Sequence, residues 1–494
     1  MPEHPSARLV AIAIASAGLS ALFGLSQSSP VFGVAAGMAF ATLLSILVLP
    51  EKYVVYPVFV VIVNMLDHTT TTEVAMYGGV GLRASLWQLA AFGVSPAMIV
   101  FSVLLVRGLF SMTQGAMGRI RWLVLYFLVL MPVVSMAYGF LLHERPMRIF
   151  GDAKVPLFFI VGYLIFSSYY RRYPQQLLST CQVLLAMVAG HFALDYFYLL
   201  TQRFVDDTSG FGNVSLDSGK GFVCVLIFAA IAQIYRRRNI LFNLVIILLS
   251  LHLLVSYQTR WLLVTLLAGA VLTMIYTGLR ALPSVLTTAV FLMVAIPVVV
   301  RWSPTAWEVM SLRFRLSEGT VDLSTAGLEA LDACRVASIY NALGTLSEKY
   351  AFLTGVGYGG WYDDRFYAFP PLTLHAFDLE SLNAGQFYRV HDFTIHFLFK
   401  FGVLGILLYA GVFVRPLIKL WRPRRALLEK SAFGTVVIVL VGTTPMIMTA
   451  MFWTGKGLLA SALLAVLASR LWPQGGNSRD SSHLPGIPLP APPK

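Results

Sequence analysis

The residues of this chain best suited to chemistry are a histidine and two arginines, each at a boundary between polar and apolar sequence. His391 lies in RVHDFTIHFLF, where a long polar interval meets an apolar run. Arg260 lies in SYQTRWLL, between two apolar runs, and Arg335 opens the stretch RVASIYNALGTLSEKY. A neutral histidine can take a proton near pH 7, and a planar guanidinium pairs with phosphate oxygens at two points. These residue types predict acid–base chemistry beside a phosphate-bearing substrate.

His391 has two competing explanations. A histidine at the edge of an apolar segment is often a polar group that reaches the surface and has no chemical role. Its neighbour Asp392 favours a functional role, because a carboxylate raises the pKa of an imidazole, although the same aspartate could instead cap a helix. His396 would diverge from His391 on a helix, so the two histidines predict no metal site. We take His391 as the candidate catalytic residue.

Other charged residues near apolar runs have simpler explanations. Lys220, in DSGKGFVCVL, could add a third cation to the site, but a lysine whose ammonium reaches the surface is the favoured interpretation. Arg145 and Arg148 share an interval with Glu144 and Asp152, and ion pairing on the surface accounts for these four.

The stretch GVGYGG, Gly355 to Gly360, formally matches the dinucleotide-binding fingerprint. No strand–helix–strand pattern surrounds it, so we interpret it as a tight turn that uses the freedom of glycine at positive φ. Gly355 and Gly357 then support the site rather than bind a ligand. The sequence contains no other nucleotide motif and no metal-ligand spacing, so we expect no cofactor and no metal.

The elements that must position these residues are apolar. Hydrophobic residues make up 57% of the chain and charged residues 12%, and the mean hydropathy is +0.75. Apolar runs recur that are near the length a helix needs to cross ~30 Å of hydrocarbon, and lipid-facing spans of this kind must be helical. The composition predicts an all-α, polytopic integral membrane protein with about 12–14 transmembrane helices and one large exoplasmic loop.

The predicted spans follow the apolar runs in order. They are 9–25, 31–49, 53–66, 86–106, 121–141, 153–170, 178–200, 219–235, 240–256, 261–279, 284–300, 392–414, 431–451 and 457–472. The first could be a cleaved signal peptide, but the second follows so closely that we favour a retained helix.

Charge in the short loops predicts the orientation. Basic residues follow the even-numbered spans: Lys52, Arg107, Arg119, Arg121, Arg171, Arg172, Arg236–Arg238, Arg280 and 415–430. The alternate loops carry the acids: Asp67, Glu73, Glu144, Asp152, Asp206, Asp207 and Asp217. Because basic loops stay cytoplasmic, both termini are predicted to be inside the cell. The basic loops account for the net charge of +13. The sequence shows no basic face interleaved with aromatic residues, so it does not predict nucleic-acid binding.

This orientation divides the chain into four parts. Residues 1–301 hold about eleven transmembrane helices, 302–391 form the exoplasmic loop, 392–472 hold the C-terminal helices, and 473–494 form a disordered cytoplasmic tail. The loop is rich in aromatics, and its stretch 328–350 predicts an amphipathic helix on the membrane surface or over a cavity. Three isolated cysteines predict no disulfide framework.

Arg260, Arg335, the glycine turn and His391 together resemble the O-antigen ligase and O-antigen polymerase superfamily of bacterial membrane enzymes. The resemblance covers about residues 205 to 412. It includes a serine or threonine before the first arginine, a second arginine that opens a loop helix, and a histidine at the start of an apolar helix with a glycine pair. The chain departs from the pattern at Asp392, where family members often carry asparagine.

The resemblance implies a metal-independent inverting glycosyltransferase of the bacterial inner membrane, with its active site on the periplasmic face. The donor would be a glycan on undecaprenyl pyrophosphate, and the acceptor a hydroxyl on lipid A core or on a growing polysaccharide. His391 would be the base, and Arg260 and Arg335, with Lys220, would hold the pyrophosphate. Ligase and polymerase stay open. A transporter or exporter of lipid-linked glycan is the alternative, disfavoured because charges are expected only at span ends.

Overall fold

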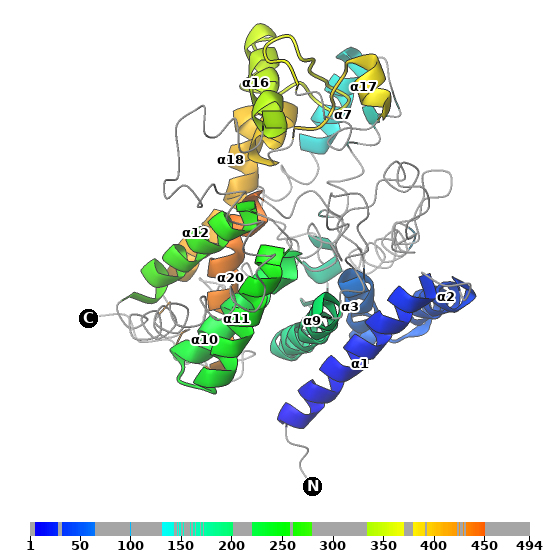
Figure 1. Ribbon diagram of the computed structural model, residues 1–494, viewed down its shortest axis with the longest axis vertical. Helices are drawn as coiled ribbons and strands as arrows, with labels where there is room; N and C mark the ends of the chain where they lie inside the picture. The colour runs from blue at the N-terminus through cyan, green and yellow to red at the C-terminus, as the bar shows by residue number, and fades with distance from the viewer. Residues whose placement is uncertain are drawn as a thin grey trace.

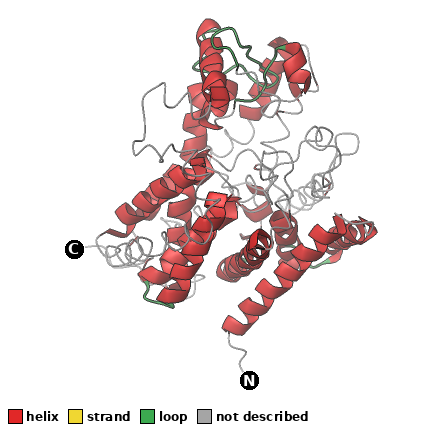
Figure 2. Cartoon of the chain, viewed as in Figure 1, coloured by secondary structure: helices red, strands yellow, loops and turns green. Residues whose placement is uncertain are grey.

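The computed structural model describes most of the chain in ten ranges. These are 5–27, 32–64, 131–142, 172–200, 220–256, 260–278, 333–369, 379–390, 393–421 and 431–449, with isolated positions at 99, between 146 and 170, and at 424 and 428. These residues form helices and loops, and the β-pairing among them is one isolated bridge between Tyr362 and Phe387. The all-α prediction is therefore confirmed (Figure 2).

Apart from the predicted loop helix at Ala333–Glu348 and the short helix at Leu379–Ala384, which was not predicted, the observed helices coincide with predicted apolar runs wherever these lie in the described ranges. They are α1 (Pro5–Gln27), α2 (Phe32–Val48), α3 (Val55–Asn64), α7 (Met131–Leu142), α9 (Leu177–Leu200), α10 (Lys220–Tyr235), α11 (Ile240–Ser256), α12 (Arg260–Thr277), α16 (Ala333–Glu348), α17 (Leu379–Ala384), α18 (Phe393–Trp421) and α20 (Ser431–Thr449), with 3-10 turns at Glu51–Tyr53 and Pro174–Gln176. The predicted spans 86–106, 284–300 and 457–472 lie outside the described residues, apart from residue 99.

One helical stretch of the described part, Pro174–Leu194, is long and apolar enough to cross a membrane. Shorter apolar helices of 10–17 residues lie in α1, α2, α7, α10, α11, α12, α18 and α20.

Close helix packing depends on small residues. α1 lies along α9, where Gly190 abuts the backbone of Ala13 and Ser16 Oγ donates a hydrogen bond to the Met187 carbonyl over 3.1 Å. α20 packs against α10 and α12, and the ring of Phe228 lies against Gly442 at that crossing (Figure 1). Small residues allow helix backbones to approach this closely, as in membrane helix pairs.

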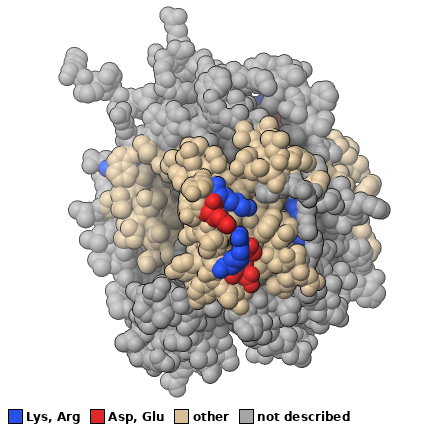
Figure 3. All heavy atoms as spheres, turned by 90° about the horizontal axis from the view of Figure 1, so that it is seen from above, with Lys and Arg blue, Asp and Glu red and all other residues tan. Residues whose placement is uncertain are grey.

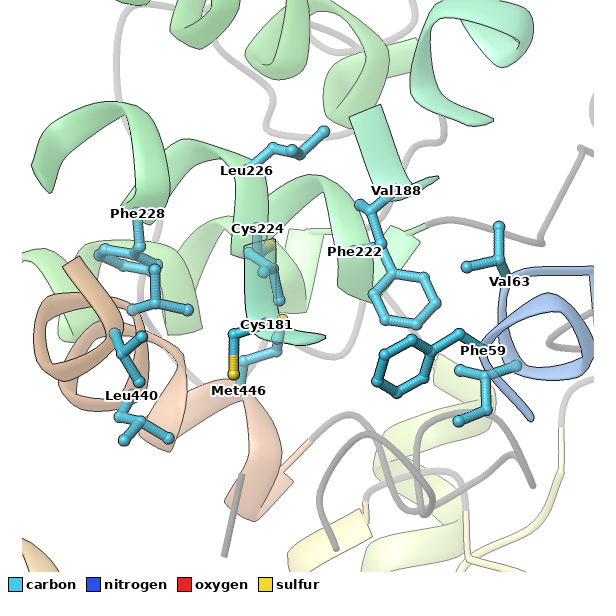
Figure 4. Packing of buried hydrophobic residues seen from close by; sticks show 14 of the residues in the cluster. Phe59, Val63, Cys181, Val188, Phe222, Cys224, Leu226, Phe228, Leu440 and Met446 are labelled. Carbon is cyan, nitrogen blue, oxygen red and sulfur yellow. The ribbon is translucent and has the colours of Figure 1, made fainter. Parts of the chain in front are cut away.

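The main core joins α3, α9, α10 and α20. Phe59, Phe222 and Met446 belong to one cluster of buried side chains with the buried free thiols of Cys181 and Cys224 (Figure 4). Burial of such side chains stabilises the folded chain in proportion to the apolar area that they remove from the surface.

A second, smaller cluster joins α16, the segment 351–369, α17 and the first turns of α18. It lies at one end of the molecule, and the turn between α10 and α11 lies toward the other (Figure 1). The predicted loop helix is confirmed as α16 within the described residues 333–348. Its buried positions include the polar Asn341 and Thr345 as well as Ala337 and Leu346, while Ile339 is only partly buried.

The crossing of α1 and α9 generates a stability prediction. A methyl group at Gly190 would overlap the backbone of Ala13, which cannot move without separating the helices. We expect Gly190→Ala to lower the free energy of unfolding by roughly 1–3 kcal/mol, the usual cost of overpacking, seen as a lower melting temperature of the purified protein.

The matched control is Gly37→Ala in α2, where an added Cβ meets no atom within 4 Å. Alanine favours helix over glycine, so this variant should melt at the same or a higher temperature. Equal melting temperatures for Gly190→Ala and the wild type would contradict the close crossing.

Candidate functional site

The predicted site residues lie in different parts of the structure. Arg335 is half-buried in the first turn of α16, and the later turns of α16 belong to the smaller cluster. Lys220 and Arg260 begin α10 and α12 in the main bundle, and their side chains lie outside the described part. His391 and Asp392 also lie outside the described residues, between Val390 and the start of α18. The structure thus brings the glycine turn and the helix that carries Arg335 together, because residues of both belong to the smaller cluster.

The glycine turn has the predicted backbone conformation. Gly355, Gly357 and Gly359 have φ angles of 72°, 76° and 75°, a region that side chains with a Cβ rarely adopt. The turn lies between two helices, because the Tyr358 N–H donates to the Ser135 carbonyl of α7 over 3.3 Å while its other residues contact α18. The prediction of a tight turn is confirmed, and its role is to join two helices.

α18 is broken at Gly402, which the prediction of one continuous span 392–414 missed. Gly402 has φ 66° and ψ −173°, far from helical values. The freed carbonyls of Phe399 and Lys400 accept hydrogen bonds from the N–H groups of Val356 and Gly357, at 2.8 and 3.0 Å. Buried backbone groups need such partners, so the loop fills the break.

The other side of the break is satisfied in the same way. The Val403 N–H donates to the Phe352 carbonyl over 2.9 Å, and the Leu404 N–H donates to the Leu353 carbonyl over 3.3 Å. The first segment of α18 therefore belongs with the loop, and the second continues along the bundle. The sequence signal was present as a glycine in an apolar run, but a glycine there also suits plain helix packing.

A buried ion pair lies at the break. Lys400 is 1% exposed, and its ammonium donates to Asp152 Oδ2 over 2.6 Å and to the Gly360 carbonyl over 2.8 Å. The same carboxylate oxygen accepts from the Gly359 N–H over 2.9 Å. One pair therefore connects three segments that are far apart in the sequence.

Two predictions about charge are wrong. Asp152 does not pair with arginine on the surface, because the ammonium of Lys400 takes its carboxylate. Arg148 places its guanidinium over the ring of Tyr388, 4.6 Å from the centroid, and Glu144 and Arg145 lie outside the described residues. Lys400 also lies inside the predicted span 392–414, so charges are not confined to span ends. The expectation for Asp152 failed because the sequence around a lysine in an apolar run does not indicate that a distant carboxylate will pair with it.

The surroundings of the pair are positively charged. Arg148 and Arg389 are both close enough to Lys400 to interact with it electrostatically, so among the described residues one carboxylate faces three cations. The buried hydroxyl of Tyr358 has a pKa raised by burial and, secondarily, by the charge of Asp152, and it stays protonated.

The backbone leading to His391 is held by its neighbours. The Tyr362 hydroxyl donates to the Arg389 carbonyl over 2.7 Å, and the Val390 N–H donates to His396 Nδ1 over 3.3 Å. Tyr362 also pairs with Phe387 through two backbone hydrogen bonds. The chain thus reaches residue 391 from an anchored position.

Asn341, which the sequence did not single out, connects α16 to the loop. Its Oδ1 accepts from the N–H groups of Phe366 and Tyr367, at 3.0 and 2.8 Å, and its Nδ2 donates to the Tyr367 carbonyl over 2.7 Å. A polar residue on the buried face of a helix is the signal that could have identified it.

No protein-family model, no curated protein and no solved structure matches this chain. The described part of the site is a half-buried arginine, a glycine turn and a buried ion pair at a helix break. The turn holds the backbone at the break in α18, and the ion pair holds the charges of Lys400 and Asp152 there.

The ion pair generates a prediction with single and double variants. Lys400→Met or Asp152→Asn leaves one buried charge without its partner, which costs on the order of 3–5 kcal/mol of stability. The double variant Lys400→Met with Asp152→Asn removes both charges and should melt closer to the wild type. Thermal unfolding of the purified protein measures all three.

The control is the exposed pair of Arg365 and Glu348, whose side chains are 56% and 48% accessible. Arg365→Met should change the melting temperature little, because solvent screens such a pair. A Lys400→Met protein as stable as the Arg365→Met protein would contradict the buried pair.

Proposed function

We propose that this chain is a membrane glycosyltransferase of the O-antigen ligase or polymerase type. It would transfer or polymerise a glycan from an undecaprenyl-pyrophosphate donor onto a saccharide hydroxyl, on the periplasmic face of a bacterial inner membrane. The observation that carries the proposal is the smaller cluster. There α16 with Arg335, the glycine turn, and the backbone up to Val390 pack with α18, so that motif segments from a long stretch of sequence belong to one unit.

The distribution of exposed apolar side chains supports a membrane location. Large apolar side chains are exposed on helices at different sides of the molecule: Ile14 on α1, Leu141 on α7, Leu241 on α11, Leu267 on α12 and Leu407 on α18 (Figure 1). A protein partner would cover one face, whereas a bilayer covers all of them.

Contacts between loops support the predicted orientation. Arg172 pairs with Glu51, Arg236 Nη1 donates to Thr435 Oγ1 over 3.0 Å, and the rings of Tyr276 and Trp421 lie 5.6 Å apart. Each contact joins two helix ends or loops that the charge pattern assigns to the cytoplasmic side. Ends assigned to the same side of the membrane thus meet one another.

The proposed chemistry uses the chain's own groups. The acceptor hydroxyl oxygen forms a bond to the anomeric carbon, the bond from that carbon to the pyrophosphate breaks, and undecaprenyl pyrophosphate leaves. His391 takes the hydroxyl proton, with Asp392 supporting its ring. Arg260 and Arg335, with Lys220 as a third cation, stabilise the charge that develops on the leaving pyrophosphate.

The buried pair at the helix break supports a second candidate function, export of a lipid-linked glycan. Transporters use interrupted helices and buried charges at the substrate site, and Lys400 with Asp152 at Gly402 has both features. An exporter of lipid-linked glycan would move its substrate without changing any bond. Covalent analysis of the product therefore separates the two functions.

The function is tested first by glycan analysis of a strain in which the gene is deleted. Loss of all polymer from lipid A core would identify a ligase, and a single repeat unit left on the core would identify an O-antigen polymerase. Loss of secreted polymer with normal lipopolysaccharide would identify an exopolysaccharide polymerase. Unchanged glycan linkage in all fractions would contradict the transferase.

His391→Gln tests the proposed base. Glutamine can hydrogen-bond the acceptor but cannot take its proton, so we expect transfer to fall by on the order of 10²–10⁴-fold. Membrane insertion should not change. The measure is glycan transfer in membranes that contain equal amounts of protein, with His483→Gln in the predicted tail as the matched control. Turnover of His391→Gln near the wild-type rate would exclude the base.

Arg335→Lys tests the proposed contact with pyrophosphate. Lysine keeps the charge but loses the planar two-point contact, and a lost charge-assisted bond of roughly 1.5–3 kcal/mol corresponds to roughly 10- to 150-fold in rate. Arg365→Lys is the matched control, because Arg365 lies in the same loop but is exposed and paired with Asp363 and Glu348. Equal rates for the two variants would contradict the contact.

A further inference from the structure

The end of α16 has an unusual residue at the position that reverses the chain. The Ala351 N–H donates to the Leu346 carbonyl over 2.9 Å, and Tyr350 has φ 52°, which together form the common glycine-type helix end. A tyrosine in this left-handed conformation is strained, and such strain points to a requirement for the side chain itself.

The side chain of Tyr350 is almost fully exposed. It is 94% exposed, and the next apolar side chains, Phe352 and Leu353, are 41% and 59% exposed. Three large apolar residues within four positions thus project from the end of the helix. Packing within the chain explains the exposure of none of these side chains, so we expect them to contact an apolar surface outside the chain.

This surface continues onto α18. The carbonyls of Phe352 and Leu353 accept hydrogen bonds from Val403 and Leu404, so the two segments lie side by side. Val403, Leu404 and Leu407 are themselves exposed. We call the combined surface the apolar edge: Tyr350, Phe352, Leu353, Val403, Leu404 and Leu407. It joins the tip of the loop to the helix that continues into the bundle.

Charged side chains of the same loop pair with one another. Glu348 and Asp363 both pair with the exposed Arg365, at 3.0 and 2.6 Å. Viewed from the end that carries α16, basic and acidic side chains gather next to one another on the described surface (Figure 3). The loop therefore has a charged face for water and an apolar edge continuous with α18, a division typical of segments at a membrane interface.

We propose that the apolar edge is inserted into the exoplasmic leaflet of the bilayer. Phe352 and Leu353 would lie among the acyl chains, and the Tyr350 hydroxyl would reach the headgroup region, where tyrosine is enriched. The loop is then attached to the membrane at its tip. The glycine turn and the break at Gly402, which are bonded to the same segment, are thereby held at the depth of lipid headgroups.

This depth has a consequence for substrate. The phosphates of a lipid-linked substrate lie at the headgroup level, so the attached loop would meet them without leaving the membrane. The inference rests on the membrane part of the proposed function and does not depend on the transfer chemistry.

The test uses the full chain in phosphatidylethanolamine and phosphatidylglycerol vesicles, with Cys181, Cys224 and Cys334 replaced by alanine. A nitroxide is attached to Leu353→Cys, and its collision rates with oxygen and with a nickel chelate are measured by electron paramagnetic resonance. Oxygen concentrates in lipid and the chelate in water. We expect a larger oxygen-to-nickel collision ratio at residue 353 than at the control Asp364→Cys, an exposed position of the same loop.

Leu267→Cys on α12, a position that is 68% exposed and lies outside the apolar edge, separates the two proposals. A lipid-like ratio at 267 with a water-like ratio at 353 would overturn the inserted edge and leave the membrane protein intact. Water-like ratios at both positions would overturn the membrane location and the proposed function with it. A label at 353 that is shielded from both reagents would show a protein partner on the edge and would also overturn the inference.

Tyr350→Gly provides an independent variant. Glycine adopts positive φ without strain, so this protein should melt at the same or a higher temperature than the wild type. Loss of the anchoring ring should nevertheless lower the oxygen-to-nickel ratio at residue 353. An unchanged ratio would mean that the tyrosine does not hold the edge in the leaflet, contrary to the proposal.

Discussion

The break of α18 at Gly402 is the constraint on which the described site depends. A helix that stops inside a protein exposes carbonyls on one side and N–H groups on the other, and each needs a partner when it is buried. Here a single loop, residues 352–357, supplies partners to both sides. The loop and the helix therefore acquire their conformations together, and the glycine turn is part of the helix rather than a connection beside it.

Charge follows from this geometry. Lys400 is the last residue but one before the break, and its ammonium lies where helix carbonyls end and loop carbonyls begin. Asp152 neutralises it and also accepts from the turn, so the pair adds to the same junction. Replacing both members of such a pair by apolar residues often leaves the free energy of unfolding unchanged. The role of the pair is then to favour one arrangement of the segments over others.

The surface of the molecule has two kinds of environment. Apolar side chains are exposed on helices at different sides, whereas the loop end carries paired charges. In the proposed function, a lipid-linked donor and a water-soluble sugar meet at the boundary between these environments. The proposed transferase and the inserted loop tip both use this boundary, one for chemistry and the other for attachment.

The sequence by itself determined the helices and the turn. Run length and composition predicted segments such as α9 and α11 nearly to their ends, and glycine spacing predicted the turn at Gly355, because both depend on local interactions. The tertiary structure alone decided the break at Gly402 and the pairing of Lys400 with Asp152, 248 positions away. The sequence around Lys400 does not predict Asp152 as its partner, and the sequence around Asp152 does not predict Lys400. Their attraction becomes strong only after folding removes both from water.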